Sequence, residues 1–271
     1  MFQASTSSAS ADSPRGADAE RVREAFDALS PPNALLMMME ARAPWELAAM
    51  AAAGPLLRRL PRGDTHPVLV FPGLGANDLT TLPLRNLLDE LGHVALPWQQ
   101  GFNFGPRPGV LDQCEADVRA TYARYHRRVS LVGWSLGGLY AREVAKRVPE
   151  MVRSVVTLGT PFTGHPRATN AWRFFELVSG HSSSDPEQLD ALREPPPVPC
   201  TSIYSRTDGV VAWRCSVNAP APQVENVHVP ASHIGLGVNP LALYAVADRL
   251  AQPSGRWKPF APPAPLRWLF R

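Results

Sequence analysis

The sequence has few of the residues that bind metal ions or cross-link a chain. Its 271 residues include three cysteines and seven histidines, and no two cysteines have the CxxC spacing of a structural zinc site. We therefore expect neither a metal ion nor another cofactor. Cys114 falls on the apolar side of an expected helix and is assigned to the core. Cys200 and Cys215 flank Asp208, and the sequence leaves open whether they form a disulfide.

Lysine is also scarce, and the positive charge is unevenly spread along the chain. The formal net charge is +3, but residues 253–271 carry four basic side chains and no acidic one. The rest of the chain is close to neutral. A broad basic surface of the kind that binds nucleic acid is therefore excluded, and we expect no nucleic-acid partner.

Long apolar runs and a recognisable export signal are absent as well. The most apolar early stretch, residues 34–60, is interrupted by five charged residues and two prolines. A membrane-spanning helix needs about 20 consecutive apolar residues, so none is predicted. Residues 1–19 lack the basic start and apolar centre of a secretory signal, and we expect a cytoplasmic protein.

Proline, by contrast, is abundant, and its distribution indicates how the chain is organised. None of the 29 prolines lies between Gly109 and Val148, which predicts the most regular structure there. Before residue 64, helical pieces are expected to break at Pro31, Pro32, Pro44 and Pro55. The predicted units are a disordered lead (1–19), a helical segment (20–64), a main domain (65–252) and a proline-rich basic tail (253–271).

Apolar runs bounded by glycine or proline alternate with helical patterns through the main domain. Strands are predicted at residues 67–72, 93–98, 129–134, 152–158, 201–205 and 224–229, and helices at 79–91, 110–125, 136–148 and 240–251. This alternation predicts an α/β fold with a mostly parallel sheet of about six strands and helices on both faces. The pattern breaks at residues 162–199, which we interpret as an insertion.

One pentapeptide carries a specific chemical signal. Gly133-Trp134-Ser135-Leu136-Gly137 follows an apolar strand and precedes a helix, as a nucleophile elbow requires. The two glycines leave room for a sharp turn that exposes the serine, and the helix N-terminus favours negative charge beside it. A serine in such a turn can instead merely cap the helix.

Two later residues favour the catalytic interpretation of Ser135. Asp208 lies three residues beyond one predicted strand and His233 four residues beyond the next, so the chain order is serine, acid, histidine. At these positions the acid can orient the histidine, and the histidine can take the serine proton. Other acids and histidines lack such a placement and are expected at the surface or at strand edges: Asp185, Asp190, Asp248, His66, His93, His126, His165, His181 and His228.

Together these segments resemble the α/β-hydrolase superfamily and, within it, bacterial lipases and esterases related to triacylglycerol lipases and GPI inositol-deacylases. The resemblance covers about residues 68–250. Its strongest pieces are Phe71-Pro72-Gly73-Leu74-Gly75, the serine pentapeptide, Leu158-Gly159-Thr160-Pro161, residues 204–211 and Ser232-His233. It implies a catalytic triad of Ser135, Asp208 and His233. The backbone N–H groups of Leu74 and Leu136 are the candidate oxyanion hole.

The sequence departs from the pattern of the superfamily in two places. Pro72 stands where many relatives have a histidine before the oxyanion glycine. No antiparallel pair of strands is evident before Val68, so we expect a reduced sheet of about six strands whose edge is covered by the N-terminal helices.

The insertion at 162–199 lies where α/β-hydrolases carry lids. Its most apolar part supplies the predicted substrate-binding residues Trp172, Phe174, Phe175 and Val178. A closed lid over an acyl pocket would bury them, as would a lipid interface, a partner or plain core packing. The tail at 262–271 mixes basic and aromatic residues, which fits either peripheral contact with an anionic membrane or docking on its own domain.

The leading hypothesis is therefore a serine hydrolase of carboxylic esters. It would act as a lipase-like esterase on a small-molecule or lipid ester through an acyl-enzyme. Acyl transfer to an alcohol at the same serine, or a catalytically inactive binding module, are the alternatives. The intact set of serine, acid and histidine argues against the inactive module, whereas the oligomeric state is left undetermined.

Overall fold

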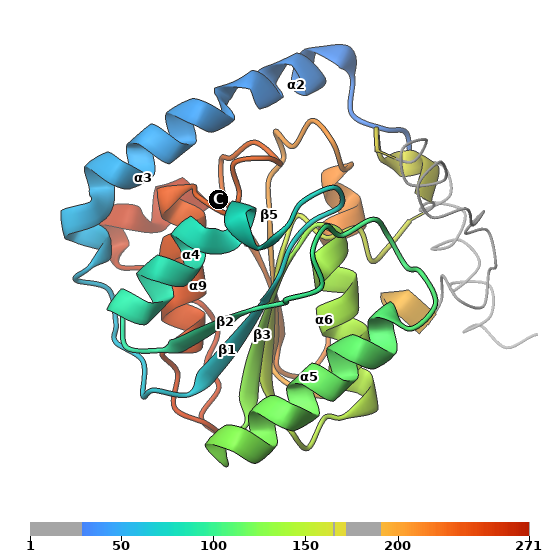
Figure 1. Cartoon of the computed structure of the whole chain (residues 1–271). Helices are drawn as coiled ribbons and strands as arrows, with labels where there is room; N and C mark the ends of the chain where they lie inside the picture. Colours follow the sequence, from blue (N-terminus) through green and yellow to red (C-terminus); the bar gives the residue numbers. More distant parts are fainter. Residues whose placement is uncertain (1–28, 165, 172–190, 271) are drawn as a thin grey trace, which may run out of the picture.

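The computed structural model describes residues 29–164, 166–171 and 191–270 (Figure 1). The predicted lid residues Trp172, Phe174, Phe175 and Val178 lie outside these ranges, as do His165, His181, Asp185 and Asp190. Within the described ranges, no helix combines the length and the apolar character that a membrane span requires.

Six strands form one sheet in which every pair of neighbours is parallel. The strands are β1 (Pro67–Phe71), β2 (Val94–Pro97), β3 (Val129–Trp134), β4 (Val152–Leu158), β5 (Cys200–Tyr204) and β6 (Val224–His228). Their order is β2-β1-β3-β4-β5-β6. The predicted fold class and strand number are confirmed.

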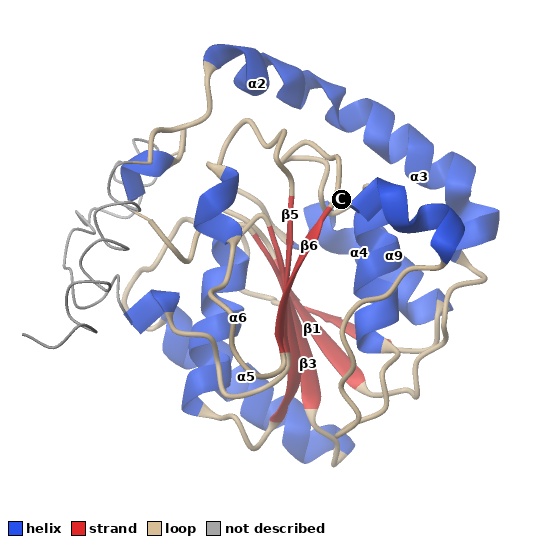
Figure 2. Cartoon of the chain, turned by 180° about the vertical axis from the view of Figure 1, so that it is seen from behind, coloured by secondary structure: helices blue, strands red, loops and turns tan. Residues whose placement is uncertain are grey.

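Helices cover both faces of the sheet and produce two apolar cores (Figure 2). The longer helices are α4 (Asp78–Glu90), α5 (Val110–Tyr125), α6 (Leu136–Arg147) and α9 (Pro240–Leu250). Successive side chains of β1 point to opposite faces. Val68 and Val70 pack in the core formed with α4 and α9, whereas Leu69 and Phe71 pack in the core formed with α5 and α6. The sheet is thus buried on both sides, as parallel sheets are.

The N-terminal helices differ from the prediction in where they break and where they lie. They are α2 (Ala34–Met39), a 3₁₀ turn η1 (Glu40–Arg42) and α3 (Ala43–Leu57). Pro44 does not break the helix because it lies in the first turn of α3, where its missing N–H is not needed. Pro55 is accommodated in the last turn. Instead of covering an edge strand, α2 and α3 cross the loops that follow β5 and β6 (Figures 1 and 2).

The described part of the C-terminal tail docks on its own domain. It ends in a 3₁₀ helix, η4 (Ala264–Phe270). The rings of Phe260 and Phe270 lie 6.0 and 5.7 Å from that of Tyr244 on α9. The two alternatives for the tail were contact with a membrane and docking on its own domain. The described residues dock on the domain, although Trp268 remains exposed.

All three cysteines are buried free thiols. Cys114 lies in the core beneath α5, as expected. Cys200 lies on β5 near the Arg142 guanidinium, at 3.5 Å, whereas Cys215 packs in a small cluster with Ala168 and Val211. The two cysteines that flank Asp208 therefore pack in different clusters and form no disulfide.

Candidate active site

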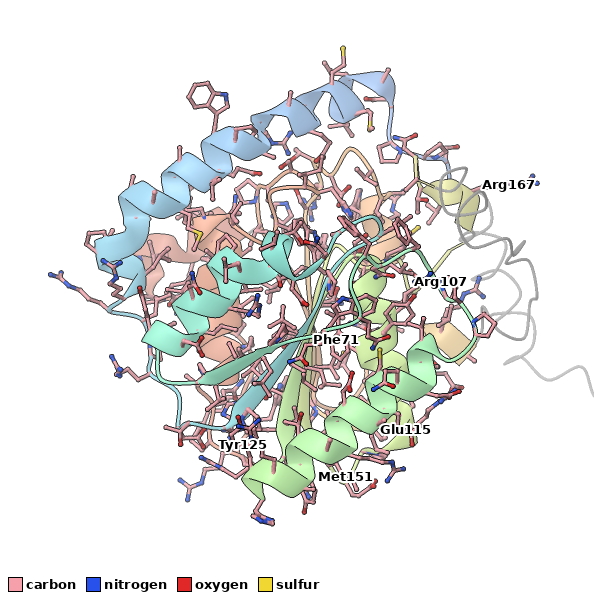
Figure 3. All side chains as sticks on the ribbon, viewed as in Figure 1. Phe71, Arg107, Glu115, Tyr125, Met151 and Arg167 are labelled. Atoms are coloured by element: carbon pink, nitrogen blue, oxygen red, sulfur yellow. The ribbon has the colours of Figure 1, made fainter. Side chains whose placement is uncertain are left out.

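Ser135 occupies the sharp turn between β3 and α6. Its φ of 52° and ψ of −122° are strained for a residue with a side chain. A Cβ on Gly137 would lie 2.3 Å from the carbonyl oxygen of Phe71, whose ring lies in the interior (Figure 3). Only glycine therefore fits at this position. The Ser135 side chain makes no capping hydrogen bond to α6, which contradicts the interpretation of this serine as a simple helix cap.

The structure brings Ser135 together with the predicted acid and base. The Oγ of Ser135 lies 3.0 Å from Nε2 of His233, and Nδ1 of His233 lies 2.6 Å from Oδ2 of Asp208. Both distances are those of hydrogen bonds. His233 and Asp208 are only 6% and 4% exposed, so their pair is largely shielded from water.

Asp208 is held in place by its own loop. Its second carboxylate oxygen, Oδ1, accepts hydrogen bonds from the backbone N–H groups of Val210 and Val211, at 2.8 and 2.7 Å. The loop is tied in turn to the histidine loop, because Ser205 Oγ donates to the carbonyl of Ala231 at 2.6 Å. The carboxylate therefore has one oxygen committed to the backbone and the other to His233.

Opposing effects act on the protonation of His233. Burial by itself would lower the pKa of the imidazole, but the charge and hydrogen bond of Asp208, with a smaller contribution from Glu40, outweigh it. The pKa of His233 is therefore raised above its ordinary value. Such a histidine is well suited to accept a proton.

The two residues predicted to supply oxyanion donors lie on either side of Ser135. Leu136 is the first residue of α6, where backbone N–H groups have no partner within the helix. Leu74 follows Gly73. The backbone at Gly73 lies so close to Ser135 that a Cβ added to this glycine would lie 3.3 Å from Cβ of Ser135. The role of both amides remains a prediction.

Asn103 is a buried residue of this site that sequence analysis missed. Its side chain donates to the carbonyl of Pro72 at 2.8 Å, and its backbone pairs with Gly75 and Ala76. These bonds fix the loop that carries Leu74. The sequence offered no signal for this role, because the contact joins segments about thirty residues apart.

Charged residues of the N-terminal helices also reach this site and were missed. Glu40, Arg42 and Glu46 contact the loops that carry Asp208 and His233. The sequence contains one signal that could have pointed to these three residues. They are the only charged residues between positions 34 and 57. In the sequence they interrupt an apolar run, and nothing there joins them to Asp208 or His233.

The remaining described histidines and acids are not brought to Ser135. His126 caps the end of α5, His228 lies on β6, and Asp248 pairs with Arg249 on α9. His66 and His93 are buried directly before β1 and β2, which agrees with the expected strand-edge role and contradicts only the surface alternative. The described residues contain no group of three or more histidine, cysteine or acidic side chains arranged to hold a metal ion.

Comparison with solved structures finds the same architecture among hydrolases. Lipase B of Aspergillus fumigatus superposes with a TM-score of 0.53 at 19% identity, over 70% of this chain and 53% of the lipase. A monoacylglycerol lipase of Paleococcus ferrophilus superposes with a TM-score of 0.53 at 14% identity, over 71% of this chain and 96% of the lipase. The chain has the α/β-hydrolase fold. The prediction of this fold from the serine pentapeptide and its flanking elements is confirmed.

Two curated relatives that match part of this chain are named esterases. The pimeloyl-(acyl-carrier protein) methyl ester esterase of Shewanella woodyi is 33% identical over 113 residues, which are 41% of this chain and 42% of that protein. The corresponding esterase of Shewanella sp. strain MR-7 is 28% identical over 127 residues, or 46% of each chain. The matched segments thus span less than half the length of these relatives. No family model matches this chain.

Proposed function

We propose that the chain is a serine hydrolase of carboxylic esters. The observation that carries this proposal is the continuous hydrogen-bonded series from Ser135 Oγ through His233 to Asp208. It lies at a strained, glycine-flanked turn that leads into a helix N-terminus. The esterases and lipases among the relatives and fold neighbours support the same class of reaction.

In the proposed mechanism, His233 takes the hydroxyl proton of Ser135 as Oγ attacks the acyl carbon. Asp208 orients the ring and stabilises the imidazolium. The N–H groups of Leu74 and Leu136 stabilise the tetrahedral oxyanion, and loss of one such donor typically costs about 3 kcal/mol. His233 then gives the proton to the departing alkoxide, and water releases the acyl group by the reverse steps.

The proposed substrate is an ester with a medium or long acyl chain. Two curated relatives are pimeloyl-(acyl-carrier protein) methyl ester esterases, and the fold neighbours include lipases. We assign the acyl contacts to the lid residues Trp172, Phe174, Phe175 and Val178. Each buried methylene adds up to about 0.8 kcal/mol of binding, so p-nitrophenyl esters should be hydrolysed best at about C6 to C12. An optimum at acetate that Phe175→Ala leaves unaltered would contradict this assignment.

A fluorophosphonate probe tests the reaction class directly. The wild-type protein should become covalently labelled on the Ser135 peptide, as identified by mass spectrometry, and should lose ester hydrolysis in parallel. Ser135→Ala should remain unlabelled. An unlabelled wild-type protein, or labelling at a different serine, would refute the proposal. Product analysis in the presence of an added alcohol separates hydrolysis from acyl transfer.

A further inference from the structure

Glu40 is a buried acid that contacts both halves of the proposed proton relay. It is 4% exposed. Its Oε1 accepts hydrogen bonds from the backbone N–H groups of Gly209, at 2.7 Å, and of His233, at 2.9 Å. Its Oε2 accepts from the N–H of Ile234 at 2.9 Å. One carboxylate thus joins the residue after Asp208 to the backbone of the histidine itself.

The chain allows this contact only because the helix approaches the acid loop very closely. A Cβ on Gly209 would lie 2.2 Å from the carbonyl oxygen of Leu36 on α2. Any other residue at position 209 would push the helix away from the loop. Hydrogen bonds to an ionised acceptor are about twice as strong as neutral ones, so the three bonds to Glu40 form a firm link.

Arg42 and Glu46 join the same helices to the loops of Asp208 and His233, beside the contacts of Glu40. A guanidinium nitrogen of Arg42 donates to the carbonyls of Thr207, at 2.8 Å, and Ala231, at 2.6 Å. Glu46 Oε1 accepts from the N–H of Ser232 at 2.9 Å, and Oε2 accepts from its hydroxyl. All three charged residues of α2, η1 and α3 are therefore engaged with the two loops.

We propose that Glu40 is a positioning residue, which holds the loops of Asp208 and His233 in register for proton transfer. The inference rests on the proposed function. Because the relay requires hydrogen-bond contact at both nitrogens of His233, a displacement of about 1 Å can reduce the rate by up to about 100-fold. The N-terminal helices then belong to the catalytic apparatus although none of their residues touches the reacting atoms.

Glu40→Gln tests this role with almost no change in size. The substitution removes the negative charge. It also places the amide NH₂ of glutamine opposite at least one backbone N–H, so that two donors face each other. The matched control is Glu90→Gln, an exposed glutamate on α4 that pairs with Arg58. We expect Glu40→Gln to lower kcat for a p-nitrophenyl ester by about 10- to 100-fold with little change in KM. The control should leave both unchanged.

The pH profile distinguishes positioning from general destabilisation. Charged or titratable groups near His233 are Asp208, Glu40, Arg42 and Glu46, with the Cys215 thiol close to Asp208. Loss of the Glu40 charge should lower the pKa of His233, so the acid limb of kcat/KM should move to lower pH. A variant with wild-type kcat and an unmoved acid limb would overturn the inference.

Fluorophosphonate labelling keeps this outcome distinct from failure of the proposed function. If wild type is not labelled, the proposed function fails. If wild type and Glu40→Gln are labelled at the same rate, only the positioning role fails. Should Glu40→Gln not fold, as judged by thermal unfolding, Glu46→Gln takes its place. It should slow labelling, because Glu46 holds the backbone N–H and the hydroxyl of Ser232 beside His233, and a folded Glu46→Gln that is labelled at the wild-type rate would overturn the inference that these helices position the relay.

A second, independent observation concerns the outer face of the same helices. While their charged residues face inward, large apolar side chains stand outward, as Figure 3 shows along α2 and α3. Trp45 is 75% and Met38 68% exposed. The exposed apolar set on these helices is Leu35, Met37, Met38, Met39, Trp45, Leu47 and Leu56. Because Met50, Ala53 and Leu57 of α3 pack against the core, this helix is apolar on its outward side as well as its inward side, unlike an ordinary surface helix.

Further exposed apolar residues follow the carboxyl ends of the strands, where Ser135 lies. They are Leu79 and Leu82 at the start of α4, Phe102 and Phe104 after β2, and Ile234 beside His233. Three arginines directly follow α3: Arg58, which pairs with Glu90, and Arg59 and Arg62. So many exposed large apolar side chains, with arginines beside them in the chain, are uncommon on a monomer that contacts only water.

We infer that this face lies against an anionic lipid surface. An apolar helix face with an outward tryptophan enters the headgroup boundary, and arginines at its end add attraction to acidic lipids. An acidic protein partner would account for the arginines, whereas an anionic lipid surface accounts for both the exposed apolar side chains and the arginines Arg59 and Arg62 beside them. The proposal needs no catalytic activity and is independent of the positioning role.

Vesicle co-sedimentation tests the lipid contact. Wild type should bind vesicles of phosphatidylglycerol and phosphatidylcholine more strongly than vesicles of phosphatidylcholine alone. The double variant Met38→Glu, Trp45→Glu should bind at least about tenfold more weakly. Tyr122→Glu, an exposed aromatic on α5, should bind as wild type does. Absence of vesicle binding, or a wild-type dimer that the double variant converts to monomer in light scattering, would overturn the inference.

Discussion

Two hydrogen-bonded Ser–His–Asp series lie at opposite ends of the same sheet. At the carboxyl end of β3, Ser135 contacts His233, which contacts Asp208. At its amino end, Ser130 Oγ lies 2.9 Å from Nε2 of His66, and Nδ1 of His66 lies 2.6 Å from Asp64 Oδ1. Judged by these distances alone, the two series are nearly equivalent.

The surroundings of the two serines differ in every respect that nucleophilic catalysis requires. Ser130 lies within a strand, is fully buried, and shares its hydroxyl with Ser154 at 3.0 Å. Ser135 lies at a strained turn beside a helix N-terminus. Hydrogen-bond geometry therefore does not define a catalytic serine, because the hydroxyl must also meet a substrate and an oxyanion must find donors.

The surroundings of His66 and His233 also shift the pKa values of these two histidines in opposite directions. Burial, followed by the charge of Arg153, lowers the pKa of His66 to about 4 despite its bond to Asp64. The carboxylate of Asp64 is shared with Arg127 and Arg153. Asp208 has no such competitor in the described hydrogen bonds, and it raises the pKa of His233. A carboxylate that is already neutralised by arginines is a poor partner for an imidazolium.

The largest expected contrast comes from removing each hydroxyl. Ser135→Ala should abolish ester hydrolysis and leave the fold intact, because it removes one atom from a turn. Ser130→Ala should keep wild-type kcat but lose about 1–3 kcal/mol in the free energy of unfolding, since it leaves a buried imidazole nitrogen without its partner. Steady-state assays and urea unfolding of both variants measure the contrast. Activity of Ser135→Ala within tenfold of wild type would contradict the assignment of Ser135 as the nucleophile.

A smaller contrast is expected from the two acids. Asp208→Asn should reduce kcat by about 10⁴-fold, because the asparagine amide holds the wrong tautomer of His233. Asp64→Asn should leave kcat unchanged and lower the midpoint of urea unfolding, since it weakens the bonds to Arg127 and Arg153. If Asp185→Asn or Asp190→Asn abolished activity while Asp208→Asn did not, the assigned acid would be wrong.

The smallest effects are those of pH. The rate constant kcat/KM should rise with pH and level off above the raised pKa of His233, because only the neutral imidazole accepts the serine proton. A flat profile between about pH 5 and 9, with chemistry limiting, would contradict a histidine base.

Stability should respond to pH through the other histidine. His66 has a pKa of about 4 in the fold against an ordinary 6.5, so the unfolded chain binds more protons between these values. Stability should therefore fall as pH drops from about 6.5 to 4. His66→Gln should be less stable at pH 7 and show a weaker decline, as measured by urea unfolding. An equally steep decline in His66→Gln would assign the effect to other groups such as His93.

Much of the fold and the central residues of the site could be predicted from local patterns. The strand at 129–134 and the helix after it are recognisable because apolar runs, glycines and the absence of proline all agree there. Asp208 and His233 were found because each follows a strand end. These features depend on neighbours in the sequence, which a single sequence displays.

The contacts that escaped prediction join segments far apart in the chain. The bonds from Glu40 to Gly209 and His233 span 169 and 193 positions. The isolation of Glu40 among apolar residues sets it apart in the sequence, but it does not indicate these distant partners. Ser130 was missed as a polar partner because a serine in an apolar strand resembles any core residue. The prediction of a helix break at Pro44 was wrong for a local reason. A proline in the first turn of a helix is compatible with that helix.

The path of the N-terminal helices has a consequence for the order of folding. The loops that Glu40 joins are the last two strand-following loops of the sheet, so its bonds close very long loops of chain. Closing a long loop is entropically costly until most other contacts exist. We therefore expect the sheet to form first and the helices to dock last. The proposed catalytic residues would then reach their final register only in a late step, and an incompletely folded chain would carry Ser135 without its hydrogen-bonded partners.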